Sequence, residues 1–180
     1  MAPIVHASTL ATPIGPLTVL VADGVIRAAG FSDDAALLAE MLPPPLKTAA
    51  RVPVADLSST STALADYFAG DLPALDNLPV EQAGGPFQQR AWVALRGVPP
   101  GVLTTYQSLA GSLGGEKLAR AVGMACASNR IAPIVPCHRI TGANGSLTGY
   151  LWGLDRKRWL LDHERRNAPL AGSVRLAVTA

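Results

Sequence analysis

A cysteine and a histidine stand side by side at Cys137 and His138, with Pro136 before them and Arg139 after them. A free thiol is only a few per cent thiolate near neutral pH, so chemistry at sulfur requires activation. His138 is a candidate base, and a short helical turn opened by Pro136 would favour a thiolate through its dipole. The stretch predicts a nucleophilic cysteine, with a buried structural thiol as the alternative.

The second cysteine, Cys126, lies among small and apolar residues and is predicted to be a buried side chain. A redox partnership with Cys137 is the alternative. Two cysteines cannot form a disulfide framework, and the histidines and cysteines are too few and too scattered for a tetrahedral zinc site. We therefore expect no metal and no cofactor.

The composition, 49% hydrophobic and 16% charged over 180 residues, is that of a globular protein. No apolar run approaches the roughly 20 residues of a membrane span, and the N-terminus lacks the pattern of a signal peptide. These features predict a cytoplasmic protein without a membrane partner.

The formal charge is unevenly distributed along the chain. Residues 1–85 carry a net charge of −6, whereas residues 86–180 carry +8. A basic half that contains the reactive thiol indicates an anionic partner, with nucleic acid as the first candidate. The alternative is ordinary charge on a solvated face.

Residues 1–82 have the pattern of a small α/β domain. Strand-like segments at 5–12, 17–21 and 25–31 are joined by turn sequences and predict an antiparallel sheet. Helices are predicted at 33–41 and 58–69, and the proline- and glycine-containing residues 71–85 are interpreted as a linker.

Residues 83–168 are predicted to form a mostly helical domain, followed by a C-terminal tail at 169–180. The Gly114-Gly115 turn between predicted helices 106–113 and 116–127 gives the outline of a helix-turn-helix. Because the second of these helices carries small residues and Arg120, it favours close docking in a minor groove. On the last helix, residues 155–166, we expect 156–158 to face solvent.

The ordered motifs of the second half resemble those of the O6-alkylguanine-DNA alkyltransferases. The matching segments are Phe87-Gln88-Gln89-Arg90-Ala91-Trp92, Thr105-Tyr106, Arg120-Ala121-Val122-Gly123, Asn129, Pro136-Cys137-His138-Arg139, Gly149-Tyr150 and Leu160-Leu161-Asp162-His163-Glu164. The resemblance implies DNA repair by direct reversal, in which an alkyl group passes irreversibly from O6 of guanine in double-stranded DNA to a cysteine. It also implies a monomer that acts once.

The resemblance implies a role for each residue of the site. Cys137 would accept the alkyl group, His138 would take the thiol proton through a water, and Glu164 would orient the imidazole. Asn129 would hold the loop before the cysteine. Tyr106 would press on a phosphate and donate a proton to N3 of the leaving guanine.

The same family pattern implies how DNA is held. The damaged nucleotide must leave the stack, and Arg120 would fill the vacated space. Gln107 and Ala119 are expected at the DNA surface beside Tyr106.

The alkyl pocket is expected to be lined by Pro136, Tyr150, Leu151 and Trp152. The family usually has small residues at the last two positions, so we expect Trp152 to narrow the pocket or stack on the base, and benzyl groups to fit poorly. Arg130 replaces a common proline and predicts a looser loop. A lesion sensor without transfer and a cysteine hydrolase remain as alternative functions.

Overall fold

The first three strands of the chain form an antiparallel meander, as the sequence predicts. In the computed structural model, which describes residues 3–168, these are β1 (Ile4–Thr12), β2 (Gly15–Ala22) and β3 (Val25–Gly30). A fourth strand, β4 (Ala50–Pro53), was missed because it is short and all four of its residues are exposed, which leaves no alternating pattern. It pairs with β1 in parallel, and the sheet order is β3-β2-β1-β4. The expectation of a purely antiparallel sheet is therefore wrong, since the chain crosses over through two short helices before β4 forms.

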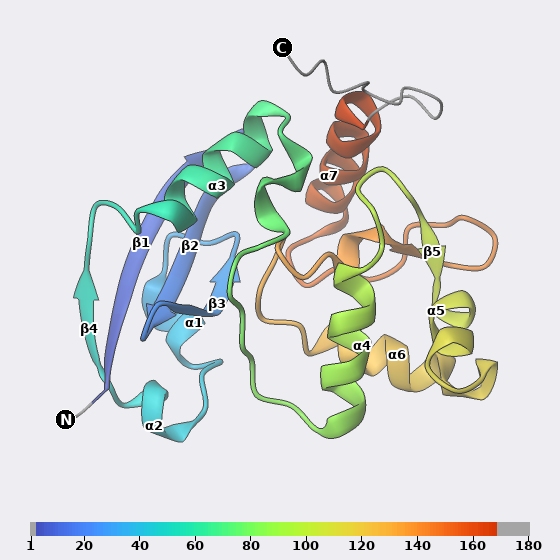
Figure 1. The fold of residues 1–180 in the computed structure, drawn as a ribbon, viewed down its shortest axis with the longest axis horizontal. Helices are drawn as coiled ribbons and strands as arrows, with labels where there is room; N and C mark the ends of the chain where they lie inside the picture. The colour runs from blue at the N-terminus through green and yellow to red at the C-terminus, as the bar shows by residue number, and fades with distance from the viewer. Residues whose placement is uncertain (1–2, 169–180) are drawn as a thin grey trace, which may run out of the picture.

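Four short helical elements accompany the sheet: α1 (Ala35–Ala39), α2 (Pro44–Lys47), α3 (Ser59–Ala69) and the 3-10 helix η1 (Leu72–Leu75). The carboxylate of Asp34 accepts hydrogen bonds from two amides of the first turn of α1 and so caps that helix. Helix α3 ends at Gly70, whose φ of 112° favours glycine. Figure 1 shows α3 running across the sheet toward α7.

The second half is mostly helical, with one small parallel pair of strands. Its elements are α4 (Pro86–Arg96), β5 (Thr104–Thr105), α5 (Tyr106–Ser112), η2 (Glu116–Leu118), α6 (Ala119–Ala127), η3 (Cys137–Arg139), β6 (Ile140–Thr141) and α7 (Leu154–Asn167). The helix predicted at 116–127 is divided into a 3-10 turn and α6. No helix within residues 3–168 is both long and apolar enough to cross a bilayer.

The segment interpreted as a linker is packed. Leu72, Leu75 and Leu78 are buried, and the backbone of Ile26 in β3 exchanges hydrogen bonds with residues 79 and 81. Ala29 in β3 likewise pairs with the segment that precedes Cys137. One hydrophobic cluster runs through both halves, so the sheet edge directly supports the cysteine loop. The boundary between 82 and 83 stays a prediction, and the tail at 169–180 lies outside the described residues.

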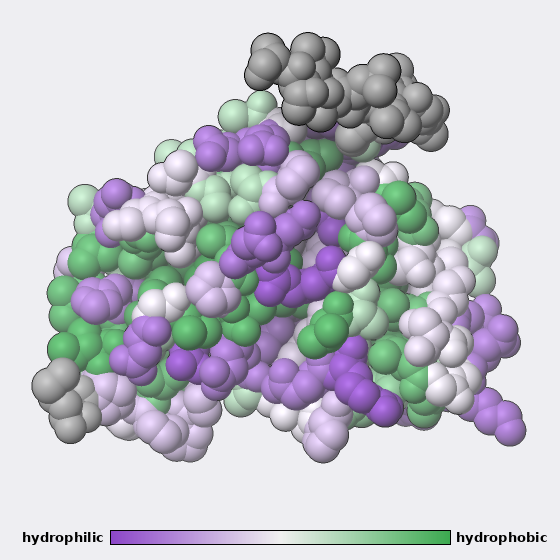
Figure 2. All heavy atoms as spheres, viewed as in Figure 1, coloured by the Kyte–Doolittle hydropathy of each residue, from purple (hydrophilic) through white to green (hydrophobic). Residues whose placement is uncertain are grey.

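One face of the molecule shows where polar groups gather. In Figure 2, hydrophilic side chains form a band across the middle of this face, over α4 and the segment leading into it. Hydrophobic patches lie on either side of this band, over the sheet and over the helices of the second half. The hydrophobic cluster beneath the surface is continuous between the two halves of the chain.

Candidate active site

Cys137 begins η3 and is only 9% exposed. Burial raises the pKa of its thiol, and the hydrogen bond from Asn129 and the charge of Lys157 only partly offset this effect. A helix dipole was predicted to lower the pKa of this thiol, but η3 has only three residues and the effect of burial is larger. The resting group is a protonated thiol that needs a proton acceptor.

Asn129 holds the loop before Cys137, as expected. Its Nδ2 donates to the carbonyl of Val135 at 2.8 Å and to Sγ of Cys137 at 3.1 Å. Its Oδ1 accepts from Nε2 of Gln82 and from the amide of Ile131, both at 3.1 Å. The Gln82 side chain also accepts from the amide of residue 130, at 2.7 Å, so the loop is held on both sides and the looseness expected there is absent. Gln82 was missed because it lies in the apparent linker.

His138 and Glu164 form the expected buried pair. Nε2 of His138 lies 2.8 Å from Oε1 of Glu164, and neither side chain is more than 1% exposed. Nδ1 of His138 has no hydrogen-bond partner among the described residues. Burial lowers the pKa of His138, although Glu164 acts in the opposite direction. A neutral imidazole whose Nε2 is bonded to Glu164 can accept a proton at Nδ1 and is a suitable base.

Two further side chains that the sequence did not assign to the site donate hydrogen bonds to Glu164. Arg139 donates from Nε and Nη2 to the carboxylate at 2.9 to 3.2 Å, and the hydroxyl of Tyr67 donates to Oε1 at 2.9 Å. Burial by itself would raise the pKa of Glu164, but His138 and Arg139 hold it well below its usual range. Glu164 is therefore a carboxylate even though it is fully buried.

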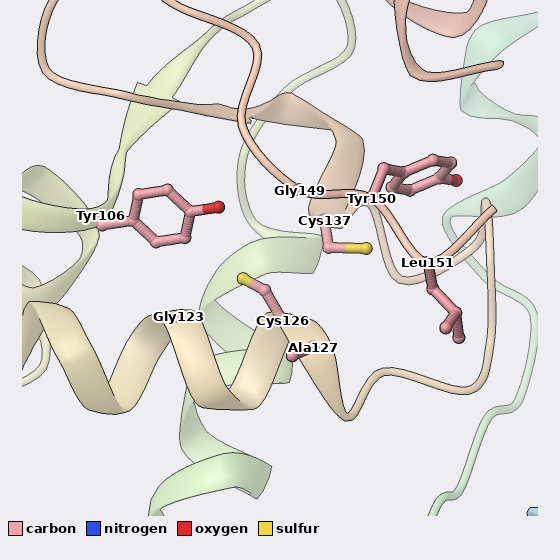
Figure 3. A pocket seen from close by; sticks show the side chains of 8 residues that line it. All are labelled: Tyr106, Gly123, Cys126, Ala127, Cys137, Gly149, Tyr150 and Leu151. Atoms are coloured by element: carbon pink, nitrogen blue, oxygen red, sulfur yellow. The ribbon is translucent and has the colours of Figure 1, made fainter. Parts of the chain in front are cut away.

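A cavity of about 210 Å³ lies against the cysteine. Figure 3 shows Tyr106 on one side with its hydroxyl directed toward the sulfurs, and Tyr150 and Leu151 on the other. Burial raises the pKa of Tyr106, and its hydroxyl is 3.1 Å from Oγ1 of Thr148, so it remains a protonated donor. The full lining is Tyr106, Gly123, Cys126, Ala127, Cys137, Gly149, Tyr150 and Leu151.

Cys126 is half-buried and lines this cavity instead of being a simple core residue. Burial raises the pKa of its thiol to about 12, so it is also protonated at neutral pH. A protonated thiol is a poor nucleophile. Cys137 differs from Cys126 in having Asn129 as a hydrogen-bond donor and His138 as the next residue.

Trp152 and Pro136 do not line the cavity, which corrects the expected pocket. The indole of Trp152 is 9% exposed and lies against Gly30 at the end of β3, where an added Cβ would come within 2.1 Å of the ring. Trp152 thus joins the second half to the sheet. The chain turns at residues 150–153, so Leu151 lines the cavity while the adjacent Trp152 packs on the sheet. The sequence alone did not predict this difference between the two neighbours.

Lys157 is fully buried, contrary to the expectation that residues 156–158 face solvent. Its Nζ donates to the carbonyl of Thr148 at 2.7 Å, and burial lowers its pKa. Arg156 is half-buried and donates to the carbonyls of Ile14 and Trp152, whereas Arg158 is exposed. Lys157 therefore ties α7 to the loop that forms one cavity wall.

The residues expected to meet DNA lie on α5 and α6. Gln107 and Arg120 are exposed, and Ala119 and Tyr106 are half-buried. Arg120 forms no ion pair with another residue in 3–168. Over the same range there is no group of three His, Cys, Asp or Glu side chains that could hold a metal ion.

Known proteins are similar to this chain in sequence and in fold. Residues 86–166 match the family model of the 6-O-methylguanine DNA methyltransferase DNA-binding domain. A Shigella flexneri methylated-DNA–protein-cysteine methyltransferase is 40% identical over 158 residues, which cover 86% of this chain and 92% of that protein. A Mycobacterium tuberculosis protein of the same name is 39% identical over 166 residues, covering 92% and 96%. The chain belongs to this family.

Solved structures of family members agree with the whole fold. The crystal structure of Mycobacterium tuberculosis O6-methylguanine methyltransferase has a TM-score of 0.75 and 38% identity, covering 92% of this chain and 96% of that one. A structure of the mycobacterial protein in complex with DNA has a TM-score of 0.76 and 37% identity, with the same coverage. The similarity therefore includes the N-terminal sheet, which lies outside the matched family domain.

Proposed function

We propose that this chain repairs DNA by transferring an alkyl group from O6 of guanine to Sγ of its own Cys137. The observation that carries the proposal is a buried thiol at a cavity wall, held by Asn129 and followed directly by a His138–Glu164 pair. Family membership supports the reaction class, and the geometry supports Cys137 as the acceptor.

The proposed reaction begins with removal of the thiol proton. His138 accepts it at Nδ1, through a bridging water, while Nε2–H remains bonded to Glu164. The sulfur then forms a bond to the alkyl carbon as the bond between that carbon and O6 breaks. The product is a thioether, which is stable to hydrolysis, so each molecule acts once.

Tyr106 is the proposed acid for the leaving group. Its hydroxyl lies on the cavity wall and stays protonated because its pKa is raised. Tyr106 donates a proton to N3 of guanine as the bond between the alkyl carbon and O6 breaks, so the base leaves as a neutral molecule. Thr148 orients the phenol through a 3.1 Å contact.

DNA is proposed to dock on α5, η2 and α6, acting as a helix-turn-helix in the minor groove. Half-buried small residues on α6 permit close approach, and Arg120 is exposed to enter the duplex. Since Sγ of Cys137 is recessed at a cavity wall, the guanine must flip out of the stack to reach it. The compared relatives are bacterial proteins named for action on DNA, and bacterial DNA lies in the cytoplasm, so we also propose a cytoplasmic location. The groups assigned to the reaction all belong to one chain, so we propose that a monomer suffices.

Intact-protein mass spectrometry tests the function directly. After incubation with duplex DNA that contains O6-methylguanine, the protein should gain one methyl group per molecule. Cys137→Ala should gain none, and Cys126→Ala should gain the same as the unmodified protein. A bound but unmethylated protein would indicate a lesion sensor, and repeated turnover would indicate a hydrolase.

A further inference from the structure

We propose that Tyr67, on α3 of the N-terminal half, is a positioning residue for alkyl transfer: its hydroxyl fixes Glu164 and weakens the attraction of that carboxylate for the proton of His138. This inference rests on the function proposed above. It gives the N-terminal half a part in the chemistry, although the matched family domain begins only at residue 86.

Tyr67 is built into the contact between α3 and α7. Its side chain is fully buried, and its hydroxyl donates to Oε1 of Glu164, 97 residues further along the chain, at 2.9 Å. Its backbone carbonyl lies 2.7 Å from Nε2 of His163, and the two rings meet edge to face with centroids 5.3 Å apart. The phenol therefore has one fixed position, with its polar end at the carboxylate.

The carboxylate of Glu164 accepts more hydrogen bonds than are needed to hold it in place. Oε1 is within 2.9 Å of the Tyr67 hydroxyl, Nε2 of His138 and Nη2 of Arg139. Oε2 accepts from Nε of Arg139 at 3.0 Å and from the amide of Gly101 at 3.1 Å. A carboxylate offers about four lone-pair sites, so Tyr67 and His138 share the electron density of one oxygen.

The presence of several donors on Oε1 of Glu164 affects His138, the proposed base. Arg139 neutralises the carboxylate, and each further donor on Oε1 reduces the stabilisation that Glu164 offers to a charged imidazole. His138 then remains neutral, and its Nδ1 can accept the thiol proton. The titratable and charged groups around the pair are Glu164 and Lys157 of α7, Arg139 and Cys137 of η3, Tyr67 of α3, and Tyr150 of the preceding loop.

The decisive variant is Tyr67→Phe, which removes the hydroxyl and keeps the ring. The rate of single-turnover methyl transfer from duplex DNA should be measured from pH 5.5 to 8.5. We expect the acid limb of the profile to move to higher pH, with transfer roughly 3- to 10-fold slower near pH 6 and close to the unmodified rate above pH 8. Profiles that differ by a constant factor, or that coincide, would overturn the proposal.

Phe68→Leu is the matched control on the same helix. Phe68 is half-buried and packs beside His163 and Trp159 without any polar atom at Glu164. The Phe68→Leu substitution should lower the free energy of unfolding, while the midpoint of the pH profile for methyl transfer stays unchanged. A shift in this control equal to that in Tyr67→Phe would assign the effect to packing and contradict the proposal.

A second measurement needs no variant. Nitrogen-15 NMR of His138 in the unmodified protein should show a neutral ring protonated at Nε2 at pH 7, and an imidazolium there would overturn the inference. The two proposals can fail separately. If the unmodified protein transfers no methyl group, both the proposed function and the role of Tyr67 are wrong. If transfer is normal and the Tyr67→Phe profile is not shifted, only the role of Tyr67 is wrong.

Discussion

The side-chain amide of Asn129 donates to the sulfur of Cys137 at 3.1 Å, and the same nitrogen donates to the carbonyl of Val135 at 2.8 Å. One amide group therefore fixes both the reactive atom and the loop that leads to it. Because the donor favours a charged sulfur, this contact acts against the rise in the pKa of the thiol that burial causes.

Asn129→Ala should both destabilise the protein and slow transfer. The substitution leaves the Val135 carbonyl and the Gln82 amide without their partners in a buried site, at a cost of about 1–3 kcal/mol for each group. Urea unfolding and single-turnover transfer would measure the two effects. Asn77→Ala, at an exposed position, should change neither, and an unaffected Asn129→Ala protein would contradict the assigned role.

Arg120→Ala should impair reaction with DNA and spare the chemistry. If Arg120 fills the space left by the flipped nucleotide, its loss should slow transfer from duplex DNA by roughly 10-fold or more. Transfer from free O6-benzylguanine should keep its rate, because the free base needs no flipping. Arg51→Ala, on the exposed β4, is the matched control. Equal losses on both substrates would place Arg120 in the chemistry instead.

Lys157→Met should raise the pKa of Cys137. The buried ammonium lowers that pKa in the folded protein, and methionine has similar length without charge. Iodoacetamide alkylation of Cys137, followed by mass against pH in a Cys126→Ala background, should show its midpoint moving to higher pH. An unchanged midpoint would limit Lys157 to its hydrogen bond with Thr148.

Gly30→Ala should destabilise the protein because the new methyl group meets the ring of Trp152. Overpacking of this kind typically costs about 1–3 kcal/mol, measurable by urea unfolding. Gly111→Ala is the matched control: it has open space for a methyl group within α5 and should stabilise by about 0.4–1 kcal/mol. Since Trp152 lies away from the cavity, Trp152→Phe should leave the rate with O6-benzylguanine unchanged.

The buried carboxylate makes stability depend on acid pH. The pKa of Glu164 is depressed in the folded protein, so its stabilisation is present above the unfolded value of about 4.3 and is lost as pH falls below it. Urea unfolding should therefore show the difference between the unmodified protein and Glu164→Gln shrinking by up to about 1.4 kcal/mol per pH unit below that point. A constant difference would show that Glu164 is not ionised at neutral pH.

Local features of the fold follow from the sequence alone, and its motifs indicate the chemistry. The turn at Asp23-Gly24, the end of α3 at Gly70 and the start of α4 at Pro86 each follow from residue types whose backbone preferences act within a few positions. The adjacent Cys137 and His138, with Glu164 in an ordered set of motifs, are the basis for predicting a reactive thiol and its base. Such signals are readable because they need no knowledge of distant contacts.

The distant groups that surround that site are known only from the three-dimensional fold. Tyr67 and Gln82 reach it from the N-terminal half, and Lys157 turns inward where its neighbours Arg156 and Arg158 suggested a solvated face. Trp152, expected in the pocket, packs on Gly30 instead. The physical reason is common to all four: a side chain's burial and partners depend on contacts between segments tens of residues apart, and residue type and spacing do not encode those contacts locally.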